Sequence, residues 1–131
     1  MAEELILIIE DNEKNRRLMR DVLQFNGYRT VESETAEEGL RLAGTLAPAL
    51  ILMDIHLPGM NGIEALGALR TDPATRGIPV MAVTASVMPQ DRQMVTGAGF
   101  DGYQSKPINV KEFTAAVKEI VSRPRKAGNP P

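Results

Sequence analysis

Three short aliphatic runs constrain the fold of this chain more than any other feature of its sequence. They are Leu5–Ile9, Leu50–Met53 and Val80–Val83, and they are rich in Ile, Leu and Val without alternating polar residues. Runs of this kind are typical of strands that are buried on both faces, as in parallel sheets. Their shortness favours strands over turns of a buried helix. The sequence therefore predicts three central strands of a parallel sheet.

Helical patterns separate these runs. The first covers Glu13–Asn26, where Leu18, Val22 and Phe25 form one stripe that we expect to face the core. A capping box at residues 35–38 opens a second predicted helix, in which Leu42 and Leu46 should face inward. A third helix is predicted at Ile63–Thr71, and a fourth starts near Pro89. The last predicted helix is capped by Asn109 and ended by Pro124.

Two weaker strands complete the set, at Tyr28–Ser33 and Asp101–Ser105. Strand and helix then alternate five times with short connections, which predicts a doubly wound α/β fold with helices on both faces of a parallel sheet. A length of 131 residues fits one domain, which we expect over residues 1–122. Residues 123–131 are rich in Pro, Gly and basic residues, and we expect a disordered tail there.

The composition excludes several classes of function. The chain has no cysteine, which rules out disulfides and a cysteine-based zinc site. A net charge of −2 argues against a nucleic-acid partner, because proteins that bind the phosphate backbone usually carry a basic excess. No apolar stretch approaches the ~20 residues of a membrane span, so we expect no membrane insertion and a cytoplasmic protein.

Polar residues follow the predicted strands at their carboxyl ends, where open α/β sheets bind ligands. Glu10 and Asp11 follow the first strand, Asp54 the third, Thr84 the fourth and Lys106 the fifth. Three carboxylates, one hydroxyl and one ammonium should therefore converge at one edge of the sheet.

The chemistry of this set points to a cation and an oxyanion. Three neighbouring carboxylates repel one another unless a cation joins them, and hard oxygen ligands favour Mg²⁺, with Mn²⁺ as a second possibility. Lys106 and Thr84 then supply a charge and a hydrogen-bond donor for an oxyanion. A carboxylate nucleophile, a divalent ion and a lysine together suggest phosphoryl transfer through an acyl phosphate.

Four separated motifs resemble those of response-regulator receiver domains, and the resemblance extends from Leu5 to about Ser122. The sequence is most similar to stand-alone regulators of the DivK type. The resemblance implies a flavodoxin-like (βα)5 fold with strand order 2-1-3-4-5. The motifs are Glu10-Asp11, the segment 52–62 around Asp54, Val83-Thr84-Ala85 and Lys106-Pro107, to which Tyr103 is added as a switch residue.

The resemblance also implies a role for each acidic residue. Asp54 is the phosphoacceptor, which takes a phosphoryl group from a phosphohistidine on a partner. Glu10 and Asp11 hold Mg²⁺, helped by Asp54 and by the backbone carbonyl of His56. Glu10 stands where many relatives have Asp, and its extra methylene suits contact with the metal through water.

Further roles follow from the same resemblance. Lys106 pairs with a phosphoryl oxygen, and its bond to Pro107 is expected to be cis. Thr84 and Tyr103 form the switch that reshapes the surface on phosphorylation. The expected partners are a histidine kinase or a histidine phosphotransfer protein, and a downstream protein.

Three residues are candidates for contact with the phosphohistidine partner: Asn15, Met19 and Pro107. The side chain of His56 has two interpretations: it is a solvated loop residue, or it tunes the lifetime of the acyl phosphate.

Two alternatives remain open at this point, and two others are disfavoured by the sequence. The chain can be a receiver cut from a hybrid histidine kinase, or a degenerate receiver that binds without being phosphorylated. An enzyme of the haloacid-dehalogenase type would need a second Asp where His56 stands, with its nucleophile on the first strand. A nucleotide- or flavin-binding module would need a Gly- or hydroxyl-rich phosphate loop after the first strand, where this chain is acidic.

Overall fold

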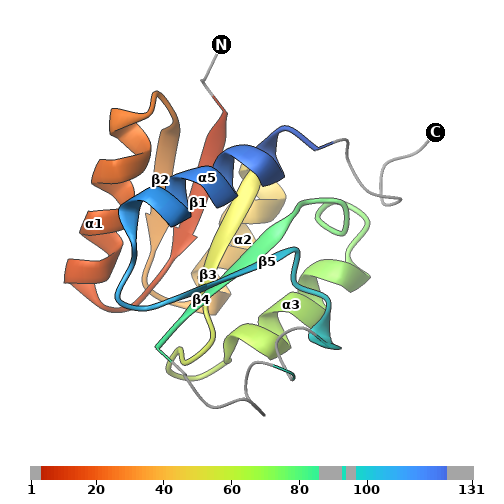
Figure 1. The fold of residues 1–131 in the computed structure, drawn as a ribbon. Helices are drawn as coiled ribbons and strands as arrows, with labels where there is room; N and C mark the ends of the chain where they lie inside the picture. Colours follow the sequence, from red (N-terminus) through yellow and green to blue (C-terminus); the bar gives the residue numbers. More distant parts are fainter. Residues whose placement is uncertain (1–3, 86–92, 94–96, 124–131) are drawn as a thin grey trace.

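Five parallel strands form one sheet in the order β2-β1-β3-β4-β5 (Figure 1). The computed structural model describes residues 4–85, 93 and 97–123. The predicted doubly wound sheet and its strand order are confirmed. The strands are β1 (Leu5–Ile9), β2 (Arg29–Ser33), β3 (Leu50–Asp54), β4 (Val80–Thr84) and β5 (Gly102–Ser105).

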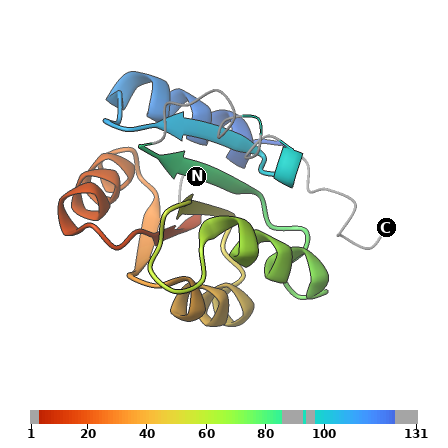
Figure 2. The ribbon, with the colours of Figure 1, turned by 90° about the horizontal axis from the view of Figure 1, so that it is seen from below.

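Helices cover both faces of this sheet (Figure 2). Helices α1 (Glu13–Phe25) and α5 (Val110–Val121) lie on one face, and α2 (Ala36–Leu46) and α3 (Gly62–Thr71) lie on the other. The predicted helix near Pro89 lies outside the described residues. Each of the four helices begins after a polar residue whose side chain accepts a backbone N–H of the first turn: Asn12, Thr35, Asn61 and Asn109.

The central strands contribute to two hydrophobic cores at once. In β1, Ile6 and Ile8 pack under α1 and α5, whereas Leu7 and Ile9 pack under α2 and α3. All four side chains are at most 1% exposed. Burial on both faces explains why these runs do not alternate with polar residues.

The buried stripe of α1 differs from the predicted one. Met19 and Leu23 are 1% exposed, whereas Leu18 is 38% and Phe25 is 91% exposed. Two apolar rows run side by side on this helix, and the row at positions 19 and 23 faces the sheet. The prediction that Met19 contacts a partner is therefore wrong, because Met19 belongs to the core.

The inner face of α2 also differs from the prediction. Leu42 is only half-buried and Leu46 is 41% exposed, while Gly39 and Ala43 are buried. A Cβ added to Gly39 would lie 2.3 Å from Cδ1 of Ile9. The helix approaches β1 so closely at Gly39 that only a small residue fits there.

The ends of the chain give two further results. Residues 124–131 lie outside the described residues, so the disordered tail stays a prediction. Within the described ranges, no helix combines the length and the apolar character that a membrane crossing requires.

Candidate functional site

The strand ends bring the predicted polar residues together at one edge of the sheet. Asp54 and Thr84 are the last residues of β3 and β4, one residue beyond the predicted ends, and Lys106 follows β5 directly. Asp54 is paired in register with Val83, and Thr84 with Ser105. Glu10 follows β1, the neighbour of β3. The predicted convergence is therefore present.

Three carboxylates form the acidic part of this site. Oxygen atoms of Glu10, Asp11 and Asp54 lie within 4.8 Å of one another. Glu10 is fully buried and Asp54 is 5% exposed, whereas Asp11 faces the solvent. Burying like charges this close together is costly unless a cation is present, and the exposed side at Asp11 leaves room for a hydrated ion. The oxygen-only donor set fits Mg²⁺ or Mn²⁺.

Lys106 supplies the positive charge on the buried side of the site. Its Nζ atom lies 2.7 Å from Oε1 of Glu10 and 3.1 Å from Oδ2 of Asp54. Burial alone would lower the pKa of Lys106, but the bond to Glu10 and the two carboxylate charges outweigh it, so the pKa is raised. The backbone N–H of Lys106 donates to the carbonyl of Thr84 at 2.9 Å, which holds the lysine against the end of β4.

Glu10 has a raised pKa. Burial is the largest cause, and it is partly offset by the bond from Lys106; the charge of Asp54 raises the pKa further. Its other carboxylate oxygen, Oε2, accepts the backbone N–H of Asn12 at 3.1 Å. Oε1 thus forms an ion pair with Lys106 and Oε2 accepts a backbone N–H, which fits contact with a metal through water.

The loop after β3 holds Asp54 through its backbone. The N–H of His56 donates to Oδ1 of Asp54 at 3.0 Å, while the His56 side chain is exposed. The N–H of Gly62 donates to the carbonyl of Ile55 at 2.9 Å. A Cβ on Gly62 would lie 2.7 Å from the carbonyl oxygen of Asp54, so the start of α3 needs glycine to approach this loop.

The remaining candidates surround this centre. Thr84 is fully buried at the edge of the site. Tyr103 lies on β5, is paired in register with Ala82, and is half-buried against the small cluster that Ala82 forms with Ile55. The Lys106–Pro107 bond is cis, as expected, and Pro107 is exposed.

Asn15 and Met19 have different positions on α1. Asn15 is half-buried in the first turn, near the acidic residues, whereas Met19 is inside the core. The predicted partner contact is therefore kept for Asn15 and Pro107 only.

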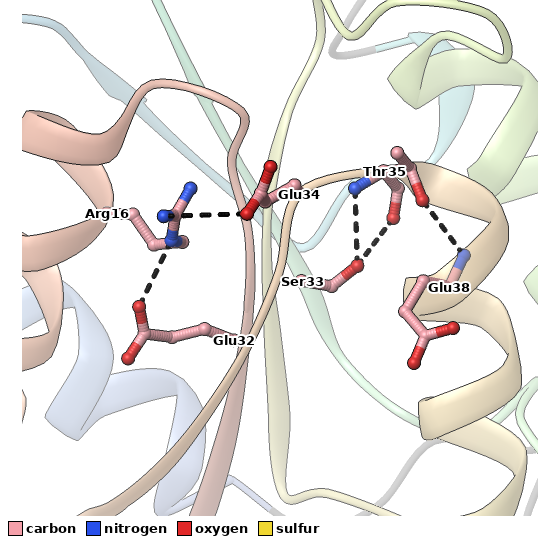
Figure 3. Close-up of a pocket in the computed structure, with 6 residues that line it drawn as sticks. All are labelled: Arg16, Glu32, Ser33, Glu34, Thr35 and Glu38. Atoms are coloured by element: carbon pink, nitrogen blue, oxygen red, sulfur yellow. Dashed lines mark hydrogen bonds and ion pairs between the residues drawn. The ribbon is translucent and has the colours of Figure 1, made fainter.

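One contact at this edge has no counterpart in the sequence-based prediction. Arg16 of α1 donates from Nη1 to the backbone carbonyl of Glu10 at 2.9 Å. It also lines an open pocket beside the end of β2, together with Glu32, Ser33, Glu34, Thr35 and Glu38 (Figure 3). The sequence shows only an arginine one turn into a helix, and its acceptors come from separate segments.

Comparison with known proteins agrees with this site. Residues 6–118 match the response regulator receiver domain family. The polar-differentiation response regulators DivK of Brucella ovis and Brucella abortus are 42% identical to this chain over 116 residues, which cover 88% of this chain and 94% of each relative. The chain belongs to the response regulator receiver domain family, whose members are the phosphoacceptors of two-component signalling. The resemblance noted from the motifs is confirmed.

Solved structures show the same fold. The receiver domain of the sensor histidine kinase PA1611 from Pseudomonas aeruginosa has a TM-score of 0.86 and 29% identity, with 93% of this chain and 100% of that chain covered. That protein was solved with a magnesium ion coordinated in its active-site cleft. A response regulator from Chloroflexus aurantiacus has a TM-score of 0.88 and 26% identity, with the same two coverages.

Proposed function

We propose that Asp54 accepts a phosphoryl group from a partner's phosphohistidine in a reaction that depends on Mg²⁺. The observation that carries this proposal is the placing of Asp54 between two further carboxylates and one ammonium at a single sheet edge. In the transfer, a carboxylate oxygen of Asp54 forms the new P–O bond while the P–N bond to the imidazole breaks. The leaving imidazole nitrogen takes up a proton from solvent.

The residues around Asp54 have separate roles in this proposal. Asp11, Asp54 and the backbone carbonyl of His56 hold the divalent ion, and Glu10 holds it through water. When bound, the ion neutralises negative charge on the phosphoryl oxygens. Lys106 keeps its positive charge throughout, and it exchanges its contact with Asp54 for one with a phosphoryl oxygen.

The signal leaves the site through Thr84 and Tyr103. Thr84 ends β4, the strand next to the one that Asp54 ends, and its hydroxyl turns to donate to a phosphoryl oxygen on Asp54. Tyr103 is half-buried on the neighbouring strand and can fill the space behind Thr84. The surface around β5 would then change and select a downstream protein.

The proposed partners are proteins. A histidine kinase or histidine phosphotransfer protein supplies the phosphoryl group, and Asn15 and Pro107 lie near the site in positions to contact it. The near-neutral charge of the chain fits partners of this kind better than nucleic acid.

A small phosphodonor tests the proposal without a cognate kinase. The chain is incubated with acetyl phosphate and Mg²⁺, and intact mass is measured. We expect one phosphoryl adduct, which Asp54→Asn and chelation of Mg²⁺ both abolish. Asp21→Asn removes an exposed carboxylate of α1 and should leave the adduct unchanged. A wild-type chain without an adduct favours the alternative of a degenerate receiver that binds partners unphosphorylated.

A further inference from the structure

Arg16 connects three segments behind the acidic residues of the site. Its Nη1 atom donates to the carbonyl oxygen of Glu10 at 2.9 Å, and its Nε atom donates to Oε1 of Glu32 at 3.1 Å. Its Nη2 atom lies 4.0 Å from Oε2 of Glu34 (Figure 3). The side chain is only 14% exposed. One guanidinium thus joins the end of β1, the first turns of α1 and the end of β2.

The carbonyl of Glu10 is part of the peptide group that joins Glu10 to Asp11, so its orientation sets where the backbone of Asp11 begins. The N–H of Glu10 is held by the carbonyl of Ser33 at 3.0 Å, so the strand side of this residue is fixed by β2. The guanidinium of Arg16 fixes the other side. Asp11 is exposed, so the direction of its carboxylate depends mainly on the backbone that carries it.

The charge of Arg16 is balanced on the side away from the site. A lone cation here would oppose the binding of a divalent ion, but Glu32 pairs with Arg16 at 3.1 Å. Arg20, one turn further along α1, lies 3.7 Å from the second oxygen of Glu32. Glu32 is therefore held between Arg16 and Arg20, and these two ion pairs fix the position of the Glu32 carboxylate on β2 relative to α1.

We propose that Arg16 is a positioning residue for divalent-cation binding. It orients the Glu10–Asp11 peptide so that the Asp11 carboxylate faces Asp54, and it touches neither the ion nor the phosphoryl group. This inference rests on the proposed function and goes beyond it, because it assigns a role to a residue outside the four receiver motifs.

The role suits arginine better than lysine. The planar guanidinium offers several N–H donors in fixed directions, and here two of them serve acceptors on different strands. An ammonium carries its three donors on one rotatable atom at the end of a flexible stem, so it does not fix the directions of two separate acceptors as the guanidinium does. Arg16→Lys should therefore keep the charge and lose most of the positioning.

Isothermal titration with MgCl2 tests this role directly, with thermal unfolding of the metal-free protein measured in parallel. Loss of a side chain that supports a metal ligand weakens metal binding about 10-fold or more, so we expect Arg16→Met to raise the Mg²⁺ Kd about tenfold. We expect Arg16→Lys to raise it by a smaller factor. Arg17→Met is the matched control, because Arg17 is the next residue, is 58% exposed and pairs with Glu13 of the same helix.

The outcomes separate this inference from the proposed function. If the wild-type chain binds no Mg²⁺, the proposed function fails. If wild type and both Arg16 variants have the same Kd for Mg²⁺, the positioning role is overturned. A lower unfolding temperature of the variants would not rescue it, because a change in stability without a change in Kd is what a purely structural residue gives. If Arg16→Met does not fold, Arg16→Lys and Glu32→Gln decide the matter, and unchanged Kd values in both overturn the inference.

Discussion

The ammonium of Lys106 lies 2.7 Å from a carboxylate oxygen of Glu10 that is fully buried. The same ammonium lies 3.1 Å from Asp54, so one positive charge serves two carboxylates. The resting site therefore carries more negative than positive charge in a partly dry environment. The excess of negative charge favours the binding of a cation. It also makes the free energy of unfolding depend on pH and on metal, in directions that can be predicted.

The first prediction concerns pH. The pKa of Glu10 is raised above 4.5 in the folded chain, chiefly by burial. Its contribution to stability is fully present below the unfolded pKa and is lost as pH rises through the raised folded pKa. Without metal, lowering the pH from about 7 to about 5 should therefore raise the free energy of unfolding of wild type relative to Glu10→Gln.

Urea unfolding in EDTA at the two pH values measures this difference. All other side chains are the same in the two proteins, so the comparison isolates position 10. A difference that stays constant, or that changes with the opposite sign, would show that Glu10 ionises as easily in the folded chain as in the unfolded one.

The second prediction concerns Lys106. Lys106→Met leaves two neighbouring buried carboxylates without their cation, and we expect a loss of about 3 kcal/mol in metal-free buffer, the lower end for breaking a buried pair. Added Mg²⁺ should restore part of the loss, since it replaces the missing charge. Lys14→Met, on the exposed face of α1, serves as the control. Equal stability of the Lys106 and Lys14 variants would contradict the shared-charge account.

The third prediction concerns Gly62. A Cβ there would lie 2.7 Å from the Asp54 carbonyl oxygen and 2.9 Å from Cα of Ile55, both backbone atoms. We expect Gly62→Ala to lose about 1–3 kcal/mol of stability and to slow adduct formation at Asp54. Gly67 lies in the same helix with nothing within 4 Å of its added Cβ. Gly67→Ala should gain up to about 1 kcal/mol.

Chemical unfolding of the two glycine variants and their rates of reaction with acetyl phosphate provide the test. If Gly62→Ala matched Gly67→Ala in both measurements, the close approach between α3 and the Asp54 loop would be without consequence.

The fourth prediction separates core from surface on α1. Met19 is 1% exposed, and Met19→Ala should lose about 2–5 kcal/mol through the cavity it leaves. Its neighbour Leu18 is 38% exposed, so Leu18→Ala should cost far less. The denaturant midpoints of the two variants give the comparison. A Met19→Ala variant as stable as Leu18→Ala would contradict the placing of Met19 in the core.

The fifth prediction concerns His56. Its contact with Asp54 comes from the backbone N–H, so His56→Ala should leave the yield of the phosphoryl adduct unchanged. The exposed side chain lies two residues from Asp54, and we expect its loss to alter the decay rate of the acyl phosphate. The decay is followed by intact mass after the donor is removed. An unchanged rate would make His56 an ordinary solvated loop residue.

Much of the site could be predicted from the sequence, because the carboxyl ends of parallel strands lie at the same edge of the sheet. The burial of β1, β3 and β4 on both faces shows in their composition, and each is followed or ended by a chemically distinctive residue. The convergence of Glu10, Asp54, Thr84 and Lys106 therefore needs only the direction of the strands, and the strand order follows from the resemblance.

Other features depend on packing that the sequence does not display. Two apolar rows on α1 are equally periodic, and only the docking of the helix selects the one with Met19. Leu46 shares a helix face with the buried Gly39 and Ala43, but it is the last residue of α2 and is 41% exposed. The contact of Arg16 with the Glu10 carbonyl requires β1, α1 and β2 to be assembled first.

Locating the modified residue tests the central claim most directly. The chain is treated with acetyl phosphate and Mg²⁺ and then with sodium borohydride, which reduces an aspartyl phosphate to homoserine, and the peptides are sequenced by mass spectrometry. The account predicts homoserine at position 54 alone, and none after chelation of Mg²⁺. Homoserine at position 11 or 101, or an unmodified Asp54 in a chain that carries a phosphoryl group, would contradict it.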